Sequence, residues 1–356
     1  MSRLVPQWTK QADGSFLDES GKVVFFSCER FVESICKGGA CFMCGTRPAC
    51  TPFNDEHVLP DWILREFGLF NRQVALPNGT FVRYSRYKIP CCVACNTDMG
   101  RRIETPVSEL LRGGHAAVTA HLQKEGSLLI FVWLMLIFLK THLRDRGFNI
   151  TLDRRVSQEP ISSLYEWEAL HHLHTVARCF KTGAEMQRNV FGTFIVLPAR
   201  VDGELETFDY ADLYAAQVAL VRFRDVAVIA VFNDSTAVTG HLWRYLDGVT
   251  GALSSVQIRE VMVEAACCNL HLKERPRYAS LVDLRERTYR LVAQLPPTPQ
   301  FDPPDLALRG SLMEHALRPL LARGSIVGYP NTDDFWAKVR EGKQTFLYDD
   351  AGSFIR

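Results

Sequence analysis

The cysteines in the first third of the chain have the spacing of metal ligands. Two Cys-x-x-Cys pairs occur, Cys41/Cys44 and Cys92/Cys95. Each pair places two thiolates on one tight turn, and two pairs supply the four sulfurs of a structural tetrahedral Zn²⁺ site. One pair alone could be a redox centre, but two pairs without a thioredoxin-like βαβ pattern favour zinc. Cys91 is an alternative ligand, although the equal spacing of the two pairs favours Cys92.

An acidic residue and a histidine, Glu56 and His57, lie between the two cysteine pairs, and Pro60 ends any regular element there. A neutral imidazole suits a general base that activates water near pH 7, and a carboxylate suits a divalent cation. Neighbours on an extended segment point to opposite sides, so both groups reach one pocket only where the strand end is kinked. The alternative is a surface glutamate beside a histidine with a structural role.

Asn96 directly follows the second cysteine pair, where a helix is expected to start. Its amide oxygen could bind the same cation as Glu56, and the alternative is an N-cap, a common role of asparagine. Glu104 lies roughly two helical turns further on, on a similar face. We interpret Glu104 as a helix-face carboxylate, with a further cation ligand as the alternative.

Taken together, the order Cys-x-x-Cys, Glu-His-x-x-Pro, Cys-x-x-Cys-Asn resembles the zinc-knuckle branch of the HNH endonucleases, which have the ββα-metal fold. The resemblance implies that His57 activates water, that Glu56 and Asn96 hold a catalytic Mg²⁺ or Mn²⁺, and that the four cysteines hold a structural Zn²⁺. Two departures stand out in the sequence. The segment 86–90 lacks the middle Asn of the family, and Asn stands where the family name has its last His.

Basic residues are concentrated between residues 62 and 102, which contain seven Lys or Arg against two acidic residues, whereas the whole chain has a net charge of +1. Such a patch suits contacts with phosphates, and a solvated basic face is the alternative. DNA is the expected partner, with RNA as an open alternative. The side chains expected to contact it are Arg86, Lys88, Arg101 and Arg102.

Length and composition predict a well-cored globular protein of two or three domains, because the chain has 356 residues, 47% of them hydrophobic and 23% charged. The eleven cysteines and the lack of an apolar N-terminal region predict a reducing, cytoplasmic location. The twelve apolar residues from Leu128 to Leu139 are fewer than the ~20 that span a bilayer. We therefore expect a buried helix there and no membrane association.

Periodicity and turn residues predict the other elements. The N-terminal part should contain a hairpin over 15–26, a helix over 61–70, a strand after a turn at 77–79, and a helix capped by Thr105. A helix over 166–180 carries His171, His172 and His174, which we interpret as core or surface histidines. Strands are expected over 191–197, 216–223 and 226–232, and helices over 255–273, 281–294 and 306–323.

These observations predict an α+β protein. Residues 1–112 should form a zinc-stapled ββα-metal nuclease domain, and residues 113–356 a larger mixed α/β domain with an antiparallel sheet. The second domain has three possible roles: it could recognise a substrate, sense a signal, or contact a partner protein or a second copy of the chain. The expected reaction is hydrolysis of DNA phosphodiesters. The alternatives are a non-catalytic zinc module that binds nucleic acid or protein, and a nuclease toxin or antiphage effector gated by the second domain.

Overall fold

The computed structural model describes residues 8–356 except 77, 152, 154, 297, 325 and 327. The chain forms two compact units, each built from three segments. Unit 1 comprises Met1–Ser108, Met135–Gln187 and Tyr278–Val292, and unit 2 comprises Glu109–Leu134, Arg188–Arg277 and Ala293–Arg356. The result is a mixed α+β protein with several small sheets, as predicted at that level. The domain boundary expected after residue 112 stays a prediction.

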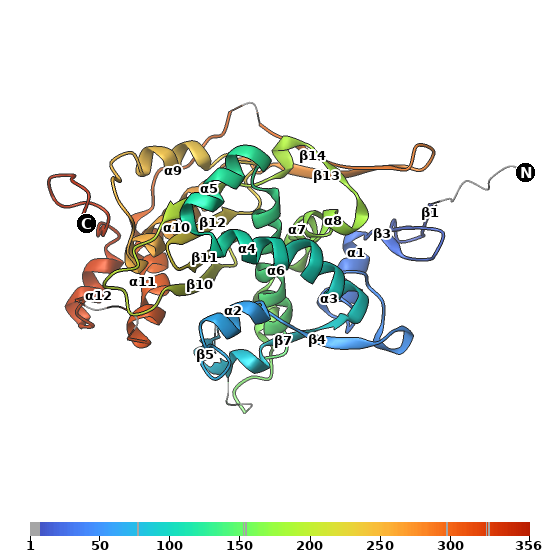
Figure 1. The fold of residues 1–356 in the computed structure, drawn as a ribbon, viewed down its shortest axis with the longest axis horizontal. Helices are drawn as coiled ribbons and strands as arrows, with labels where there is room; N and C mark the ends of the chain where they lie inside the picture. Colours follow the sequence, from blue (N-terminus) through green and yellow to red (C-terminus); the bar gives the residue numbers. More distant parts are fainter. Residues whose placement is uncertain are drawn as a thin grey trace, which may run out of the picture. The chain divides into compact units, whose positions relative to one another are not determined.

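Unit 1 holds four small sheets. The expected N-terminal hairpin is present, with the Asp18 side chain accepting hydrogen bonds from the amides of Ser20 and Lys22 in its turn. Pro77 of the predicted turn at 77–79 lies outside the described residues. The strands (Figure 1) are β1 (Thr9–Lys10), β2 (Phe16–Leu17), β3 (Val23–Phe25), β4 (Phe53–His57), β5 (Gln73–Ala75), β6 (Phe81–Arg83), β7 (Lys88–Cys92), β8 (Glu185–Met186), β13 (Arg277–Asp283) and β14 (Thr288–Gln294).

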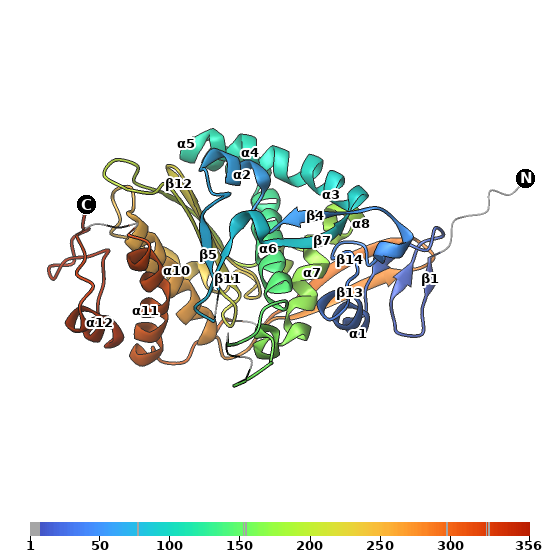
Figure 2. The same cartoon turned by 90° about the horizontal axis from the view of Figure 1, so that it is seen from below.

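A strand–strand–helix unit forms the centre of the cysteine-rich segment. β4 pairs antiparallel with β7 from Phe53↔Cys92 to His57↔Lys88. Helix α3 (Val93–Met99) follows β7 without a connecting loop and packs against both strands. Figure 2 shows the two strands side by side, next to α6. The short helix α2 (Asp61–Glu66) follows β4, so the helix expected over 61–70 is present but shorter.

The helical path continues beyond α3 through a π-helical stretch, Gly100–Glu104, into α4 (Thr105–Arg112). The prediction that Thr105 caps a new helix is therefore wrong, because its backbone is itself helical, with φ −62° and ψ −52°. A Ser/Thr–Pro pair signals an N-cap only where the preceding residues leave the helical conformation, and here they do not. The π stretch shifts the helical register by one residue per turn just before Glu104.

Helix α6 (Leu128–Asp145) contains the long apolar run, and its residues up to Leu134 belong to unit 2 and the rest to unit 1. The side chains from Ile130 to Leu139 are all buried, as expected for a core helix. No single helix among the described residues is long and apolar enough to cross a membrane, although α5 (Gly114–Glu125) and α6, bent by 113°, pass this test together.

Unit 1 also contains the histidine segment, which the sequence predicts as one helix over 166–180. The segment is divided into a 3₁₀ turn (Trp167–Leu170), α7 (His171–Ala177) and α8 (Cys179–Thr182). The other helical pieces of unit 1 are short. The helix α1 (Cys28–Arg30) leads into a π-helical stretch, Phe31–Cys36, and single 3₁₀ turns occur at Pro48–Cys50, Tyr84–Arg86 and Ile161–Leu164.

Unit 2 is organised around a four-stranded antiparallel sheet with the order β10–β11–β12–β9. Its strands are β9 (Phe194–Pro198), β10 (Phe208–Leu213), β11 (Val218–Phe223) and β12 (Val226–Val231). The predicted two-residue hairpin at Arg224–Asp225 is confirmed, and Arg224 takes the positive φ of 53° that such a tight turn requires.

Helices cover both faces of this sheet, which explains why β11 and β12 are buried along their whole length. On one face α10 (Ser255–Leu270) packs against β11 and β12, supported by α9 (Thr239–Tyr245), α11 (Leu306–Ala322) and α12 (Asp333–Arg340) (Figure 2). On the other face Phe131 of α6 packs against Phe194 and Phe232. Within α10, Arg259 forms a bidentate ion pair with the buried Asp209 at 2.7 Å.

The helix predicted over 281–294 is wrong, because this segment forms strands β13 and β14. Over so short a segment, apolar residues can fit a period of two as well as 3.6. The turn decides the outcome: Asp283 Oδ1 accepts hydrogen bonds from the amides of Arg285 and Glu286 at 2.8 and 3.0 Å, and Arg287 has a φ of 53°. A side-chain carboxylate that closes a turn in this way competes with helix formation. The helices expected over 255–273 and 306–323 are confirmed as α10 and α11.

Candidate zinc site and the adjoining charged cluster

The four predicted cysteine ligands converge in unit 1. The sulfur atoms of Cys41, Cys44, Cys92 and Cys95 all lie within 4.8 Å of one another. Tetrahedral zinc with Zn–S bonds of about 2.3 Å requires sulfurs about 3.8 Å apart, and the Cys44 and Cys92 sulfurs are 3.7 Å apart. Among the described residues this is the one group of three or more metal-binding side chains. The chemistry and spacing of the donors therefore fit a structural Zn²⁺.

Cys91 lies close to this cluster without being part of it. Its sulfur is 3.8 Å from that of Cys41, and its side chain is buried. The geometry thus favours Cys92 over Cys91 as the ligand, in agreement with the spacing argument. Cys28 and Cys36, which lie nearby in the sequence, also stay outside the cluster.

The first cysteine pair lies on a closed turn. The amide of Cys41 donates to the Thr46 carbonyl, and the amide of Gly45 donates to the Cys41 carbonyl, both at 2.8 Å. Gly45 has a φ of 73°, and a Cβ at this position would lie 2.7 Å from the Phe26 ring. Glycine is therefore required here by both the backbone conformation and the space. The turn presents Cys41 and Cys44 to the same side, as the Cys-x-x-Cys spacing predicts.

The second cysteine pair lies at a helix N-terminus. Cys92 is the last residue of β7 and the N-cap of α3, and its sulfur accepts a hydrogen bond from the Cys95 amide at 3.4 Å. The N-terminus of a helix stabilises a thiolate because its free amides and its dipole favour negative charge. Asn96 lies inside this helix, so the alternative in which Asn96 is the N-cap is wrong.

Two buried side chains of the α7–α8 segment hold the backbone of the first turn. His174 shares a hydrogen bond with the Phe42 carbonyl at 2.7 Å, and Arg178 Nε donates to the Met43 carbonyl at 2.6 Å. Arg178 also donates to the carbonyl of Val23, and its guanidinium lies 4.5 Å from the centre of the Phe26 ring. His174 is therefore a structural core residue, in line with the interpretation of the histidine segment.

The same segment places positive charge beside the sulfurs. Burial lowers the pKa of Arg178 to about 10, and the phenol of Tyr289 and the nearby thiols oppose this shift. Burial also lowers the pKa of Lys181, but interactions with Cys95, Asp98 and Cys44 together raise it overall. A zinc ion with four thiolates carries a net charge of −2, so these two cations would offset the charge of a loaded site.

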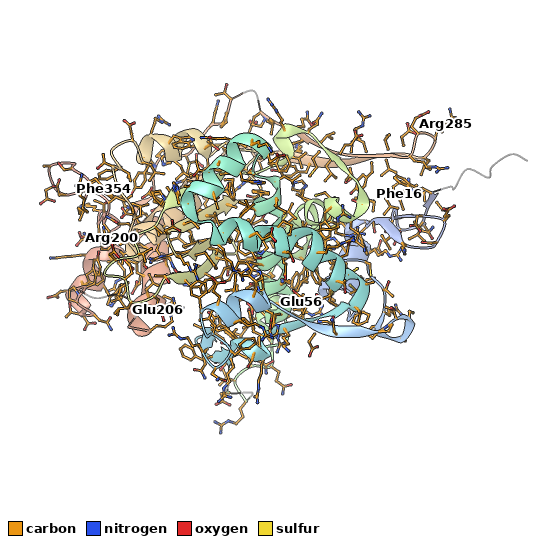
Figure 3. The ribbon with its side chains drawn as sticks, viewed as in Figure 1. Phe16, Glu56, Arg200, Glu206, Arg285 and Phe354 are labelled. Carbon is orange, nitrogen blue, oxygen red and sulfur yellow. The ribbon has the colours of Figure 1, made fainter. Side chains whose placement is uncertain are left out.

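A second charged cluster adjoins the hairpin. The side chain of Lys140, only 1% exposed, donates to Glu56 Oε1 at 2.8 Å and to the His57 carbonyl at 2.9 Å, and lies 3.5 Å from Glu104 Oε1. Figure 3 labels Glu56 near β4. Glu104 is therefore not a solvated carboxylate on a helix face, because it shares a buried ammonium with Glu56. Burial raises the pKa of Glu104 to about 7, opposed by the Lys140 charge and supported by that of Glu56.

His57, the predicted base, is half-buried at the end of β4, with its ring edge-on to Phe70 at 5.9 Å. Burial lowers its pKa below the ordinary value of 6.5, and the Lys88 ammonium, on the neighbouring strand position, lowers it further. The imidazole is consequently neutral at pH 7, the form that a general base needs. His57 and Glu56 are consecutive strand residues, and the chain bends immediately afterwards at Val58 and Leu59.

Asn96 faces the same hairpin from α3. Its Nδ2 donates to Asn54 Oδ1 at 3.0 Å, which ties the helix to β4. Asn54 and Glu56 are two residues apart on the strand and so share a face. The structure thus brings Asn96 to the Glu56 side of the hairpin, through Asn54 rather than through a direct contact with Glu56.

The basic residues predicted to contact nucleic acid are largely at the surface. Arg86, Arg101 and Arg102 are exposed and Lys88 is half-buried. Arg101 and Arg102 share Asp98, at 3.4 and 4.0 Å, and Arg102 also lies over the Phe180 ring.

Lys140 and Arg178 are important site residues that sequence reasoning did not identify. Each had a recognisable signal, because each is a charged residue inside a helical run of apolar neighbours, where a buried charge needs partners. The partners themselves lie at least thirty residues away in the sequence, so no local pattern names them.

No protein-family model, no curated protein and no solved structure matches the chain. The resemblance to HNH endonucleases therefore rests on the motifs of the sequence.

The zinc assignment predicts one tightly bound Zn²⁺ per chain. Cys92→Ser should abolish zinc binding and destabilise unit 1, because the metal's binding energy contributes to folding. Cys91→Ser should keep the metal, as should Cys50→Ser, which changes an exposed cysteine. Elemental analysis and thermal unfolding of the three variants test this, and a zinc-free wild-type protein that is fully folded would contradict it.

The Glu104 cluster predicts a specific pH dependence of stability. The folded-state pKa of about 7 exceeds the ordinary 4.5, so the folded protein binds more protons than the unfolded chain in this window. The contribution of Glu104 to stability therefore falls as the pH rises from about 4.5 to 7. Glu104→Gln cannot ionise, and its melting temperature relative to wild type should rise over this range. Exposed Glu109→Gln is the control, and parallel curves for Glu104→Gln and wild type would contradict the argument.

Proposed function

We propose that this protein is a metal-dependent endonuclease of the HNH type that hydrolyses phosphodiester bonds of nucleic acid, with DNA as the first substrate to test. The observation that carries the proposal is the strand–strand–helix unit β4–β7–α3, joined to the first cysteine turn by a four-sulfur cluster that fits zinc. This unit places His57 and Glu56 at the end of one strand and Asn96 on the helix beside it.

In this proposal His57 removes a proton from the attacking water. The lowered pKa of its imidazole supports this role, since a neutral ring is the reactive form. The site would form at the end of β4, where Glu56 and His57 pair in register with Ile89 and Lys88 and their side chains leave opposite faces, so the proposal requires the substrate phosphate to reach both side chains at the strand end. The zinc is structural and holds the unit together.

Glu56 and Asn96 would hold the catalytic Mg²⁺ or Mn²⁺, which supplies charge stabilisation at the phosphate and the leaving oxygen. The Nδ2 atom of Asn96 is engaged by Asn54, and this leaves its Oδ1 for a cation. Glu104 offers a second carboxylate close to Glu56, and oxygen donors are the ligands that these cations prefer. The Lys140 ammonium now pairs with Glu56 and must be tolerated or displaced when the cation binds.

That ion pair favours a second candidate function, a non-catalytic zinc module that binds nucleic acid. A buried Lys140 already neutralises Glu56, and removing a partner from such a pair costs about 3–5 kcal/mol. A fold in which this pair is permanent would keep the basic surface without a catalytic cation. A toxin or antiphage role and a cytoplasmic location stay predictions from the sequence.

His57→Ala separates the two functions. In the nuclease it should lower the rate of plasmid cleavage in Mg²⁺ or Mn²⁺ by ~10²–10⁴-fold, the usual contribution of a general base, while zinc content and DNA affinity remain. Glu56→Ala and Asn96→Ala should also reduce cleavage, and added Mn²⁺ should partly restore only these two. His121→Ala, on a helix of unit 2, is the matched control. A wild-type rate for His57→Ala, or no cleavage by the unmodified protein, would favour the binding module.

The exposed arginines predict a salt-dependent affinity common to both functions. Arg101→Ala with Arg102→Ala should weaken binding to all DNA sequences equally. Because each lost phosphate contact removes about 0.9 from the slope of log K against log salt, the slope should shrink by up to about 2. Arg277→Ala with Arg290→Ala removes the same charge from exposed positions of β13 and β14 and should leave the slope unchanged. Equal slopes for the two double variants would remove Arg101 and Arg102 from the interface.

A further inference from the structure

A cavity of about 210 Å³ lies in unit 1, beside β7 and the C-terminal end of α6. Three cationic residues line it: Lys88 on the strand, Arg144 on the helix, and Arg146 just after the helix. No acidic residue lines it. The cavity is therefore a concave site with three positive charges, and it is distinct from the cysteine cluster and from the Lys140 cluster.

These positive charges are not compensated by carboxylates within the described residues. None of the three side chains lies within 4.0 Å of a carboxylate oxygen there. Arg146 donates to the carbonyls of Ile35 and Cys36 at 2.5 and 2.6 Å, which fixes its position but leaves its charge in place. The guanidinium of Arg144 lies 4.4 Å from the centre of the Phe148 ring, and its Nε is shielded from solvent without an acceptor.

One acidic residue next to the cavity in the sequence interacts with the Arg144 charge but makes its hydrogen bonds elsewhere. Asp145, next to Arg144 in the sequence, turns into the protein and accepts hydrogen bonds from the hydroxyls of Tyr87 and Tyr165 at 2.6 and 3.2 Å. It does not line the cavity. An arginine held by carbonyls, an arginine with a buried donor that lacks an acceptor, and a lysine on the rim make a site suited to an anion with several acceptor oxygens.

The other walls of the cavity are apolar, among them Phe42, Ile89 and Pro90. A bare inorganic anion would gain nothing from such walls, whereas an anion attached to a sugar or a ring would bury apolar surface against them. The volume is below the roughly 300–1,000 Å³ of sites for drug-sized ligands. The cavity therefore suits a phosphate ester with part of the group that it carries.

We propose that this cavity binds a phosphate ester of a nucleic-acid strand and so positions the strand at the end of β4. Lys88 links the two places, because it lines the cavity and is the cross-strand neighbour of His57. The identity of the ligand as a nucleic-acid strand rests on the proposed function. The recognition of a phosphate ester by Arg144 and Lys88 does not depend on the proposed function. A free nucleotide carries the same phosphate ester and is the alternative ligand.

The test measures binding of DNA to the protein without added divalent cations, so that cleavage does not interfere. The probe is a short fluorescein-labelled single-stranded DNA followed by fluorescence anisotropy, with AMP and inorganic phosphate as competitors. Arg144→Gln should weaken binding of the DNA about tenfold or more, as expected for the loss of a charged hydrogen-bonding partner. Lys88→Gln, which changes a partly exposed side chain, provides a second variant should Arg144→Gln fold poorly. Arg155→Gln, whose side chain is 90% exposed and does not line the cavity, is the matched control.

The outcomes are distinct. Selective weakening by the Arg144 and Lys88 substitutions, with AMP competing better than inorganic phosphate, supports the proposal. If AMP binding depends on Arg144 but DNA binding does not, the ligand is a free nucleotide and the strand assignment is overturned. Equal affinity of all variants overturns the site itself. If the protein binds DNA through Arg144 but never cleaves it, the phosphate site is supported and the proposed nuclease function is refuted. The experiment therefore distinguishes a failure of the site from a failure of the proposed function.

Discussion

Everything in the candidate site depends on the convergence of four sulfurs from two segments that lie about fifty residues apart. Four thiols at such distances, three of them buried and Cys44 partly exposed, cannot all ionise without a cation between them, because like charges away from water repel strongly. The distance of 3.7 Å between the Cys44 and Cys92 sulfurs is therefore the distance expected for two ligands of one zinc ion. A zinc ion in this cluster would tie the first cysteine turn to β7 and α3, and Arg178 holds the same turn through the Met43 carbonyl.

The second constraint is the burial of Lys140. An ammonium that is withdrawn from water must be surrounded by acceptors, and it finds Glu56, Glu104 and the His57 carbonyl. This arrangement fixes the end of β4, and it also occupies the carboxylate that the motif assigns to a catalytic cation. Burial raises the pKa of Glu104 to about 7, and the negative charge of Glu56 adds to this effect while the Lys140 ammonium opposes it. The protonation of Glu104 can therefore change near neutral pH.

Patterns over a few neighbouring residues predicted those parts of the structure that short-range interactions determine. The cysteine spacing, the hairpin at Arg224–Asp225, the buried helix α6 and the choice of Cys92 needed only short-range patterns. The helix expected over 281–294 failed because a side chain–backbone turn at Asp283 outweighed an ambiguous period. The partners of Lys140 and Arg178 could not be predicted, because tertiary contacts choose them and one sequence carries no record of that choice.

The two strands of the hairpin explain why the motif and the structure leave two functions in competition. On β4, Asn54 contacts Asn96 of α3 and Glu56 contacts the buried Lys140. On β7, Lys88 and Ile89, the cross-strand neighbours of His57 and Glu56, line the cationic cavity. A nuclease needs the base and the cation on one phosphate, so the phosphate must lie at the strand end, within reach of two side chains that leave opposite faces of β4. A binding module needs only the cationic side. Whether Glu56 exchanges Lys140 for a divalent cation is therefore the physical step that distinguishes the two functions.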